Sequence, residues 1–323
     1  MSATAGPPRG ICRTTITTVA PSPFDFPGTA YSHGWAVLEP NRWDGGRLSL
    51  TRTDRLSRGR VVHLTITGTG SDGGRRVRAD VDHEGELGAE ERVAIRLSIR
   101  RMFRLDEDLE PFHDLCRKAG HRWKAASLGL GRLLRSPTVF EDVVKTICTT
   151  NVQWGGTKAM VRGLVRHLGE PGPLSFADPG QPERTHPNSF PTPQAIAAAD
   201  GRTLSAVRLG YRSPYVRELA ERVAGGDLDL EEFRGLDSPT DEIRRALLDI
   251  KGVGPYAAAT MLMLLGRYDH LAVDSVYRAF VAARYFEGRR PSDREAERVY
   301  AGWGSWQYLG YWFDLWQGLD DQV

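Results

Sequence analysis

The sequence predicts a mainly helical α+β protein with an antiparallel β-sheet at its N-terminal end. Apolar and polar residues alternate in short stretches between Ile11 and about Val81, and from about Val93 apolar residues recur at helical spacing. A period of two is typical of strands, and a period of 3.6 is typical of helices. A third observation is the pair Gly252 and Gly254, which interrupts the helical pattern and indicates a tight turn between two helices.

These patterns divide the chain into three segments. We expect a flexible N-terminus over residues 1–20, an antiparallel sheet domain over 21–92 and a helical core over 93–323. In the sheet domain the clearest strands are 47–52 and 60–67, and the Asp-Gly and Gly-Gly pairs between such stretches supply turns. A chain of 323 residues with 40% hydrophobic content has enough apolar side chains to bury a large core.

The helical core contains a helix, a three-residue turn and a second helix at about residues 241–265. Gly252, Val253 and Gly254 form the turn, and Pro255 occupies the first position of the second helix, where a missing N–H costs nothing. Glycine permits a close approach of another backbone or a phosphate. Because the first N–H groups of a helix lack partners within it, this turn suits an anion such as a DNA phosphate. Alternatively, the turn only connects two packed helices.

Asp274 ends an apolar stretch and begins a new helical pattern. Aspartate is among the best residues at the N-cap of a helix, which is a sufficient structural reason for its presence. The same carboxylate could also take part in chemistry, and the two roles are compatible.

The order and spacing of these residues resemble the signature of the helix-hairpin-helix superfamily of DNA glycosylases. The match runs from Ile250 to Tyr256 and continues eighteen residues later at Asp274. Segments 147–151 and 209–216 are also similar to parts of the 3-methyladenine and 8-oxoguanine glycosylases. The resemblance implies a two-part helical core, preceded by a small sheet domain as in those two branches.

The resemblance also implies a reaction. Such enzymes rotate a damaged base out of the duplex and break its bond to the sugar. Positive charge develops on the sugar, and a nearby carboxylate can stabilise it and take a proton from the attacking water. By resemblance, Asp274 is this carboxylate and Tyr256 lies in the substrate pocket. Members that also cleave the strand carry a lysine at the position of Tyr256, and tyrosine cannot form their Schiff base, so we expect a monofunctional enzyme.

Further residues are expected to bind DNA. Lys251, one of five lysines against 38 arginines, stands in the turn with Gly252, Val253 and Gly254 and is expected to contact phosphate, with a lyase role as the alternative. By resemblance, Asn151 fills the hole left by the flipped base, and Tyr211 and Arg212 wedge into the duplex and contact the partner base. Alternatively, Tyr211 covers an edge of the core and Asn151 closes a helix turn.

The segment 303–316 is the richest in aromatic residues. Flat rings can stack on a flipped base, and a ring face attracts the positive charge of an alkylated purine. We expect most of these rings to lie in the core and one or two to reach the pocket.

Composition limits the cofactors and partners. The net charge of +2 would not by itself indicate DNA, and Cys12, Cys116 and Cys148 are too few and too scattered for a disulfide framework. By resemblance, the absence of cysteine after Cys148 excludes the iron–sulfur loop of endonuclease-III-like relatives. We expect no metal site and no cofactor. The one exception that stays open is a monovalent cation at the hairpin. The N-terminus has no apolar run of signal-peptide length, so we expect a cytoplasmic, nucleoid-associated location. We also expect a monomer.

We therefore expect a base excision repair glycosylase that acts on damaged purines in double-stranded DNA, first on alkylated bases such as 3-methyladenine. An 8-oxoguanine glycosylase or a thymine or uracil mismatch glycosylase, with or without lyase activity, is the alternative within the enzyme class. The alternative outside it is a non-catalytic DNA-binding module.

Overall fold

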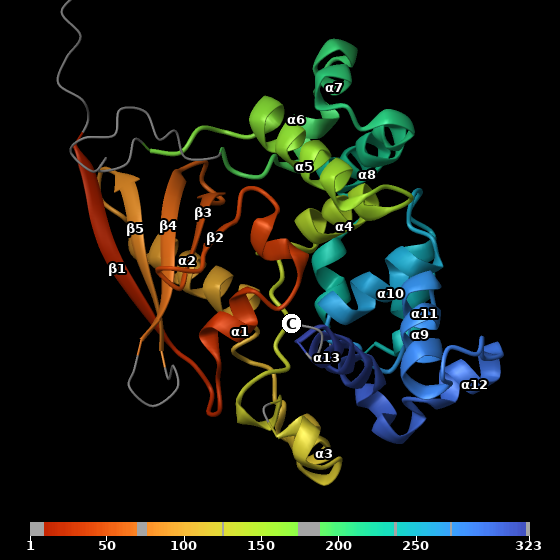
Figure 1. Ribbon diagram of the computed structural model, residues 1–323. Coiled ribbons are helices and arrows are strands. Elements are labelled where there is room, and N and C mark those ends of the chain that lie inside the picture. The colour runs from red at the N-terminus through yellow and green to blue at the C-terminus, as the bar shows by residue number, and fades with distance from the viewer. Residues whose placement is uncertain are drawn as a thin grey trace, which may run out of the picture.

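The structure is a computed structural model that describes residues 10–69, 76–124, 126–173, 188–235, 238–271 and 273–320. One five-stranded sheet forms one side of the molecule and helices form the other, as Figure 1 shows. The predicted fold class, a mainly helical α+β protein with an N-terminal antiparallel sheet, is confirmed. Among the described residues, no helix is long and apolar enough to cross a membrane.

The sheet has the strand order β1-β5-β4-β3-β2, and all neighbouring strands are antiparallel. Ile16 lies opposite Ala79, which in turn lies opposite Ile66, so buried apolar residues line up across the central strands. Alternate residues point to the same face of a strand, and this row therefore forms the inner face of the sheet. The strands are β1 (Ile11–Val19), β2 (Arg42–Asp44), β3 (Ser49–Arg55), β4 (Val61–Thr69) and β5 (Arg76–Glu84).

The N-terminal boundary of the sheet differs from the prediction. Residues 11–19, which we assigned to a flexible N-terminus, pair with β5 along their whole length as the edge strand β1. Few side chains of β1 are buried, among them Ile16 and Thr18, so the apolar signal was weak although the backbone is fully paired on one side. The other boundary also moves, because the first long helix begins at Ala89, inside the predicted sheet domain.

Helices cover the sheet and make up the rest of the chain. α2 lies against the sheet with Ile95, Ile99 and Met102 buried, and it contacts β1. The α-helices are α1 (Phe26–Ala30), α2 (Ala89–Met102), α3 (Glu110–Lys118), α4 (Val139–Thr149), α5 (Trp154–Leu168), α6 (Pro193–Ala197), α7 (Gly201–Val207), α8 (Ser213–Gly225), α9 (Thr240–Leu248), α10 (Pro255–Leu264), α11 (Ser275–Tyr285), α12 (Asp293–Arg298) and α13 (Gln307–Asp320).

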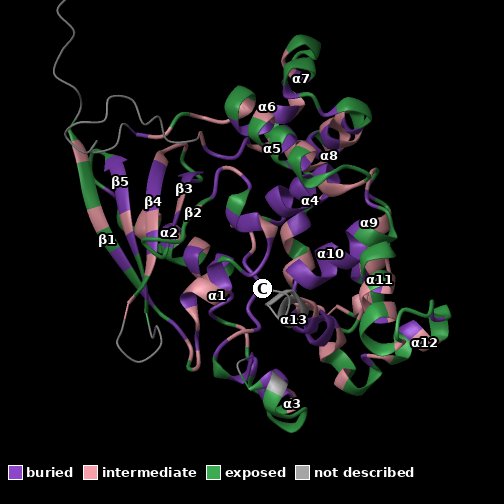
Figure 2. Ribbon diagram, in the orientation of Figure 1, coloured by how far each residue is buried: buried purple, intermediate pink, exposed green. Residues whose placement is uncertain are grey.

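α4 and α10 lie at the centre of the helical part, where Figure 2 shows them almost entirely buried. Every residue of α10 from Ala257 to Leu264 is buried, which explains why this segment is apolar on all sides. The candidate functional positions lie at the ends of these central helices and of their neighbours.

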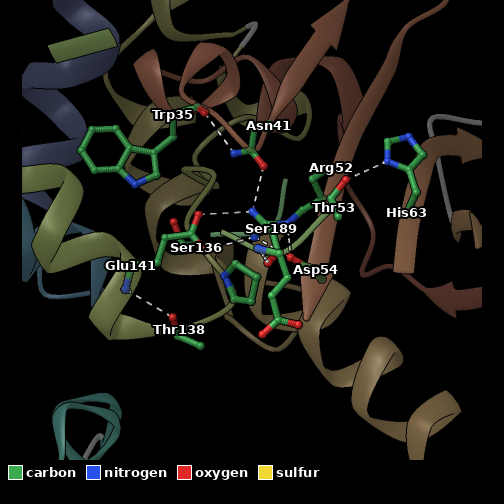
Figure 3. A network of polar contacts seen from close by, with 12 residues as sticks. Trp35, Asn41, Arg52, Thr53, Asp54, His63, Ser136, Thr138, Glu141 and Ser189 are labelled. Carbon is green, nitrogen blue, oxygen red and sulfur yellow. Dashed lines mark hydrogen bonds and ion pairs between the residues drawn. The ribbon is translucent and has the colours of Figure 1, made fainter. Parts of the chain in front are cut away.

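A buried polar network joins the sheet to α4 (Figure 3). Arg52 of β3 is 1% exposed, and its Nη2 lies 3.1 Å from Oε2 of Glu141 in α4. Glu141 also accepts a hydrogen bond from Lys145 at 2.6 Å, and Asp54 accepts one from Nε of Arg52 at 2.6 Å. Burial alone would raise the pKa of Glu141, but the charges of Arg52 and Lys145 outweigh it and lower this pKa to about 2. The ionised network fixes the position of α4 relative to the sheet.

Candidate active site

The turn between α9 and α10 owes its shape to its two glycines. Gly252 has a φ of +88°, in the left-handed region that favours glycine, and a Cβ there would lie 2.9 Å from Cδ2 of Tyr215. Gly254 is the N-cap of α10 and has extended backbone angles. A Cβ at Gly254 would meet no described atom within 4 Å, so the space beside the helix N-terminus is open. The predicted hairpin is therefore present, and it leaves room for an anion.

The side chain of Val253 points into the core, and a contact of this part of the turn with DNA stays a prediction. Its side chain is buried, and its N–H donates to the carbonyl of Ile250 at 3.0 Å. An apolar residue between two glycines holds the turn against the core, and the open N–H groups belong to its neighbours.

Lys251 is exposed, and its Nζ lies 2.7 Å from Oε2 of Glu218 in α8. An exposed pair of this kind is weak and can reopen for a phosphate. The pairing directs the amine toward α8.

Asp274 is the N-cap of α11. Its Oδ1 accepts a hydrogen bond from the N–H of Tyr277 at 2.7 Å, and the residue is half-buried. The helix N-terminus stabilises an ionised carboxylate. Capping uses Oδ1 and leaves Oδ2 for other partners. The structural role that the sequence indicated is present, and it leaves one oxygen for chemistry.

Three tyrosines lie near enough to Asp274 for its charge to act on them. Tyr256 comes from the first turn of α10, and Tyr308 and Tyr311 come from α13. Burial raises the pKa of all three, and the negative charge of Asp274 raises each pKa further. The tyrosines therefore remain protonated at neutral pH, so that their hydroxyl groups can donate hydrogen bonds beside the carboxylate. The site unites the hairpin helix, the helix that Asp274 caps and the C-terminal helix.

Asn151 lies in the loop between α4 and α5. It is exposed and has a φ of +47°, a left-handed conformation that asparagine tolerates better than most residues. Val152 and Trp154 beside it are also partly exposed, at 37% and 40%. The loop thus presents one amide and two apolar side chains to solvent, which is the composition expected of a segment inserted into a duplex.

Tyr211 and Arg212 have different surroundings. Tyr211 is 54% exposed, in agreement with a wedge, whereas Arg212 is only 5% exposed. The guanidinium of Arg212 donates to the carbonyl of Thr150 and lies 4.4 Å from the ring centroid of Tyr211. In this structure the donors of Arg212 face the loop that carries Asn151, and a contact with the partner base stays a prediction.

The chain resembles known proteins both in sequence and in structure. No family model matches the chain. The probable N-glycosylase/DNA lyase of Methanothermobacter thermautotrophicus is 25% identical over 62% of this chain and 67% of that protein. Among solved structures, MBOgg1 in complex with a low-affinity DNA ligand has a TM-score of 0.69 at 21% identity and covers 96% of each chain.

Two further structures match nearly as well. The 3-methyladenine DNA glycosylase of Archaeoglobus fulgidus has a TM-score of 0.68 at 19% identity, over 93% of this chain and 98% of that one. The 8-oxoguanine glycosylase/lyase of Clostridium acetobutylicum in complex with double-stranded DNA has a TM-score of 0.59 at 17% identity, over 84% and 89%. The chain has the fold of the helix-hairpin-helix DNA glycosylases. The match spans the sheet as well as the helices, and it confirms the resemblance at the level of the fold.

In this glycosylase fold the described C-terminal aromatic residues lie mainly in the core. Trp303 and Trp306 pack on Phe112, and Trp306 stacks on Tyr268 with 5.4 Å between ring centroids. Phe313 also contacts Phe112, so these rings belong to the core as predicted.

Tyr308 and Tyr311 are the two aromatic residues that the sequence could not single out. They are one helical turn apart, and the position of α13 places them beside Asp274. Tyr308 also stacks on Trp312, whose Nε1 donates to the carbonyl of Ser32 at 3.1 Å. Tyr308 and Trp312 therefore connect the surroundings of Asp274 to the segment that carries Ser32.

The glycosylase fold holds no evident metal site within the described residues, since no group of three histidine, cysteine, aspartate or glutamate side chains is arranged to bind an ion. Cys12 is exposed, and Cys116 and Cys148 are buried and unpaired. The absence of a cofactor and a monovalent cation at the hairpin both stay predictions.

Proposed function

We propose that this chain is a monofunctional DNA glycosylase that hydrolyses the N-glycosidic bond of a flipped-out damaged purine, with alkylated bases such as 3-methyladenine as the leading substrates. The observation that carries this proposal is the placement of Asp274 at the N-terminus of α11, within electrostatic reach of protonated tyrosines from α10 and α13. The fold shared with a 3-methyladenine glycosylase supports it.

The reaction follows from these groups. As the bond between sugar and base breaks, its electron pair leaves with the base and positive charge develops on the sugar. The Asp274 carboxylate stabilises this charge. A water molecule attacks the sugar carbon, and Asp274 accepts the proton that the water loses. The ring of Tyr256, which is 45% exposed, offers a face on which a cationic purine can stack.

The positions of the lysines support water as the nucleophile. Lys251 pairs with Glu218, and Lys145 lies in the buried network. The other three lysines, Lys118, Lys124 and Lys158, belong to α3, to the end of a short 3₁₀ turn and to α5. A strand-cleaving enzyme needs an amine at the sugar, and Tyr256 occupies that position by resemblance.

A second candidate is an 8-oxoguanine glycosylase with lyase activity. The exposed pair Asn151 and Tyr211 favours it by resemblance, and both the curated relative and one structural neighbour are named as lyases. In this case Lys251 would have to leave Glu218 and approach the sugar.

The test is base release from duplexes that carry alkylated, oxidised, deaminated or mismatched bases, each measured with and without hot alkali. We expect release of an alkylated purine, with strand breaks only after alkali treatment. Breaks without alkali would contradict the monofunctional assignment and point to Lys251.

Asp274→Asn is the variant that tests the catalytic carboxylate. Asparagine also caps helices, so the cap and the fold should be kept. We expect single-turnover base release to fall by ~10² to 10⁴-fold, while affinity for DNA stays within about twofold. Unchanged release would exclude Asp274 from the chemistry, and a wild type that binds DNA but releases none of the bases would favour the non-catalytic module.

A further inference from the structure

A second charged surface lies outside the candidate active site, between the sheet and α5. A hollow of about 660 Å³ is lined on one side by β2 and the segment before it and on the other by α5. Its cations are Arg42, Lys158, Arg162 and Arg166, and its one carboxylate is Glu39. We call this hollow, defined by these five residues, the basic groove.

The cations of the basic groove form a regular row. Lys158, Arg162 and Arg166 follow one another at intervals of four residues, so they lie on one face of α5 and span ~12 Å along its axis. Arg42 faces them from β2. A row of this kind matches a repeating anion better than a single small one.

Most of this positive charge is uncompensated. Glu39 pairs with Arg162, at 3.1 Å between Oε1 and Nε. Within the described parts of the chain, no carboxylate forms an ion pair with Arg42, Lys158 or Arg166, and all three side chains belong to exposed residues. Three cations are therefore available to a ligand from solvent.

The sheet-side wall of the basic groove is anchored to the buried network. Asn41, a buried residue of its lining, accepts a hydrogen bond from Nη1 of Arg52 at 2.8 Å and donates to the carbonyl of Trp35 at 3.0 Å. Arg52 is in turn bound to Glu141 in α4 (Figure 3). The buried network thus supports the groove, and its cations are not carried by mobile segments.

The groove is continuous with the expected DNA-facing loop. α5 begins at Trp154, three residues after Asn151, and Lys158 lies one turn further along the same helix. A duplex that received Asn151 at the lesion could therefore run along α5. Successive phosphates of one strand are ~3.4 Å apart along the duplex axis, so a row of ~12 Å spans about four of them.

We propose that the basic groove binds the phosphodiester backbone of DNA on one side of the lesion, several base pairs away from the flipped base. This assignment rests on the proposed function, because it assumes that Asn151 enters the duplex. Contacts to phosphate position a protein without reading sequence. The groove therefore lengthens the footprint on one arm of the duplex and leaves the choice of lesion to the active site.

The test uses duplexes whose two arms are shortened separately around one lesion analogue. We expect the affinity of the wild type to fall as one arm, and only one, is cut from ~10 to ~3 base pairs. The variant is Arg42→Gln, Lys158→Gln and Arg166→Gln combined, which retains the pair of Arg162 with Glu39. It should bind the long duplex ~10 to 100-fold more weakly and lose the dependence on that arm. Its salt dependence should fall by up to ~0.9 per lost phosphate contact.

The control removes three positive charges elsewhere, as Arg76→Gln, Arg96→Gln and Lys118→Gln on β5, α2 and α3, and should keep the arm dependence. The proposal is overturned if the groove variant keeps the wild-type truncation profile, or if it weakens binding of the shortest duplex as much as that of the longest. Base release from the shortest duplex at saturating protein, equal in wild type and variant, tests the proposed function separately. If the wild type released no base from any duplex, the proposed function would be overturned. The dependence of affinity on arm length would still test the groove.

Discussion

At the scale of single residues, the two hairpin glycines are required for different reasons. Gly252 needs its left-handed backbone and the space that Tyr215 leaves, whereas Gly254 has ordinary extended angles and faces open space. The first glycine is therefore a requirement of folding. The second is required only if a ligand must approach the N-terminus of α10.

Substituting these glycines separates the two requirements. Gly254→Ala should keep the melting temperature within about 2 °C, because the new methyl group meets nothing, and should weaken binding to all DNA sequences ~3 to 10-fold by obstructing a phosphate. Gly252→Ala should cost ~1–3 kcal/mol of stability through its strained backbone. Thermal unfolding and salt-dependent DNA binding check both. If Gly254→Ala lost affinity for one lesion alone, the contact with phosphate would be wrongly assigned.

Several candidate site residues could be found from the sequence, and those that could not depend on contacts between distant parts of the chain. Gly252, Gly254 and Asp274 could be found because a hairpin and an N-cap restrict the residue type locally. The burial of Arg212 could not, because its partner, Thr150, is 62 residues away in the chain. A local pattern shows that an arginine follows an exposed tyrosine, but it does not show which carbonyl lies within reach.

At the scale of elements, Arg212 determines how the loop between α4 and α5 is presented. It donates to the carbonyl of Thr150, next to Asn151, while its planar group lies against the ring of Tyr211. One buried side chain thus fixes the two segments that are expected to enter the duplex. We infer that Arg212 is a positioning residue.

Replacing Arg212 tests this role. Arg212→Gln cannot make both contacts, and the part-buried carbonyl of Thr150 that loses its donor costs up to ~1–3 kcal/mol. We expect DNA affinity to fall ~10-fold, and base release at saturating protein to fall by less. Arg202→Gln, at an exposed position of α7, is the control and should change neither. Intact affinity together with lost lesion selectivity would instead favour a direct contact with the partner base.

The accuracy with which element boundaries could be predicted depended on how many side chains each element buries. α10 could be predicted closely because all of its sides are apolar and Pro255 marks its start. β1 was missed in part, since an edge strand is held by backbone pairing that leaves little trace in its side chains. The selection of Tyr308 and Tyr311 in α13 needed the fold itself, because α13 carries aromatic residues on several faces and only its neighbours decide which ones meet Asp274.

At the scale of the whole molecule, the sheet and the helices behave as one unit, because charged and polar groups are buried between them. Besides the network around Arg52, His33 connects the two parts. Its Nε2 hydrogen-bonds to the carbonyl of Leu134, and its ring meets the edge of Trp312 in α13. Since Nε2 must donate to a carbonyl, the ring is the neutral tautomer with its proton there.

This buried histidine predicts how stability depends on pH. Burial, followed by the charges of Arg104 and Lys145, lowers the pKa of His33 from 6.5 to about 4, although its hydrogen bond to Leu134 opposes the shift. Between these two values the unfolded chain binds a proton that the folded chain does not, so stability falls as pH falls. The contribution is complete above pH 6.5 and is lost progressively down to about pH 4, for a total of ~3 kcal/mol.

His33→Gln isolates this contribution, because glutamine can still donate to Leu134 but does not titrate. Denaturant unfolding at intervals from pH 7 to pH 4.5 should show a flatter dependence in the variant, with the difference from the wild type growing as the pH falls. His121→Gln, at an exposed position, should follow the wild type. Carboxylates elsewhere, including Glu141 with its pKa of about 2, titrate alike in all three proteins and cancel in the comparison. Parallel curves for His33→Gln and the wild type would mean that water reaches this histidine and that the junction between sheet and helices opens more readily than its packing implies.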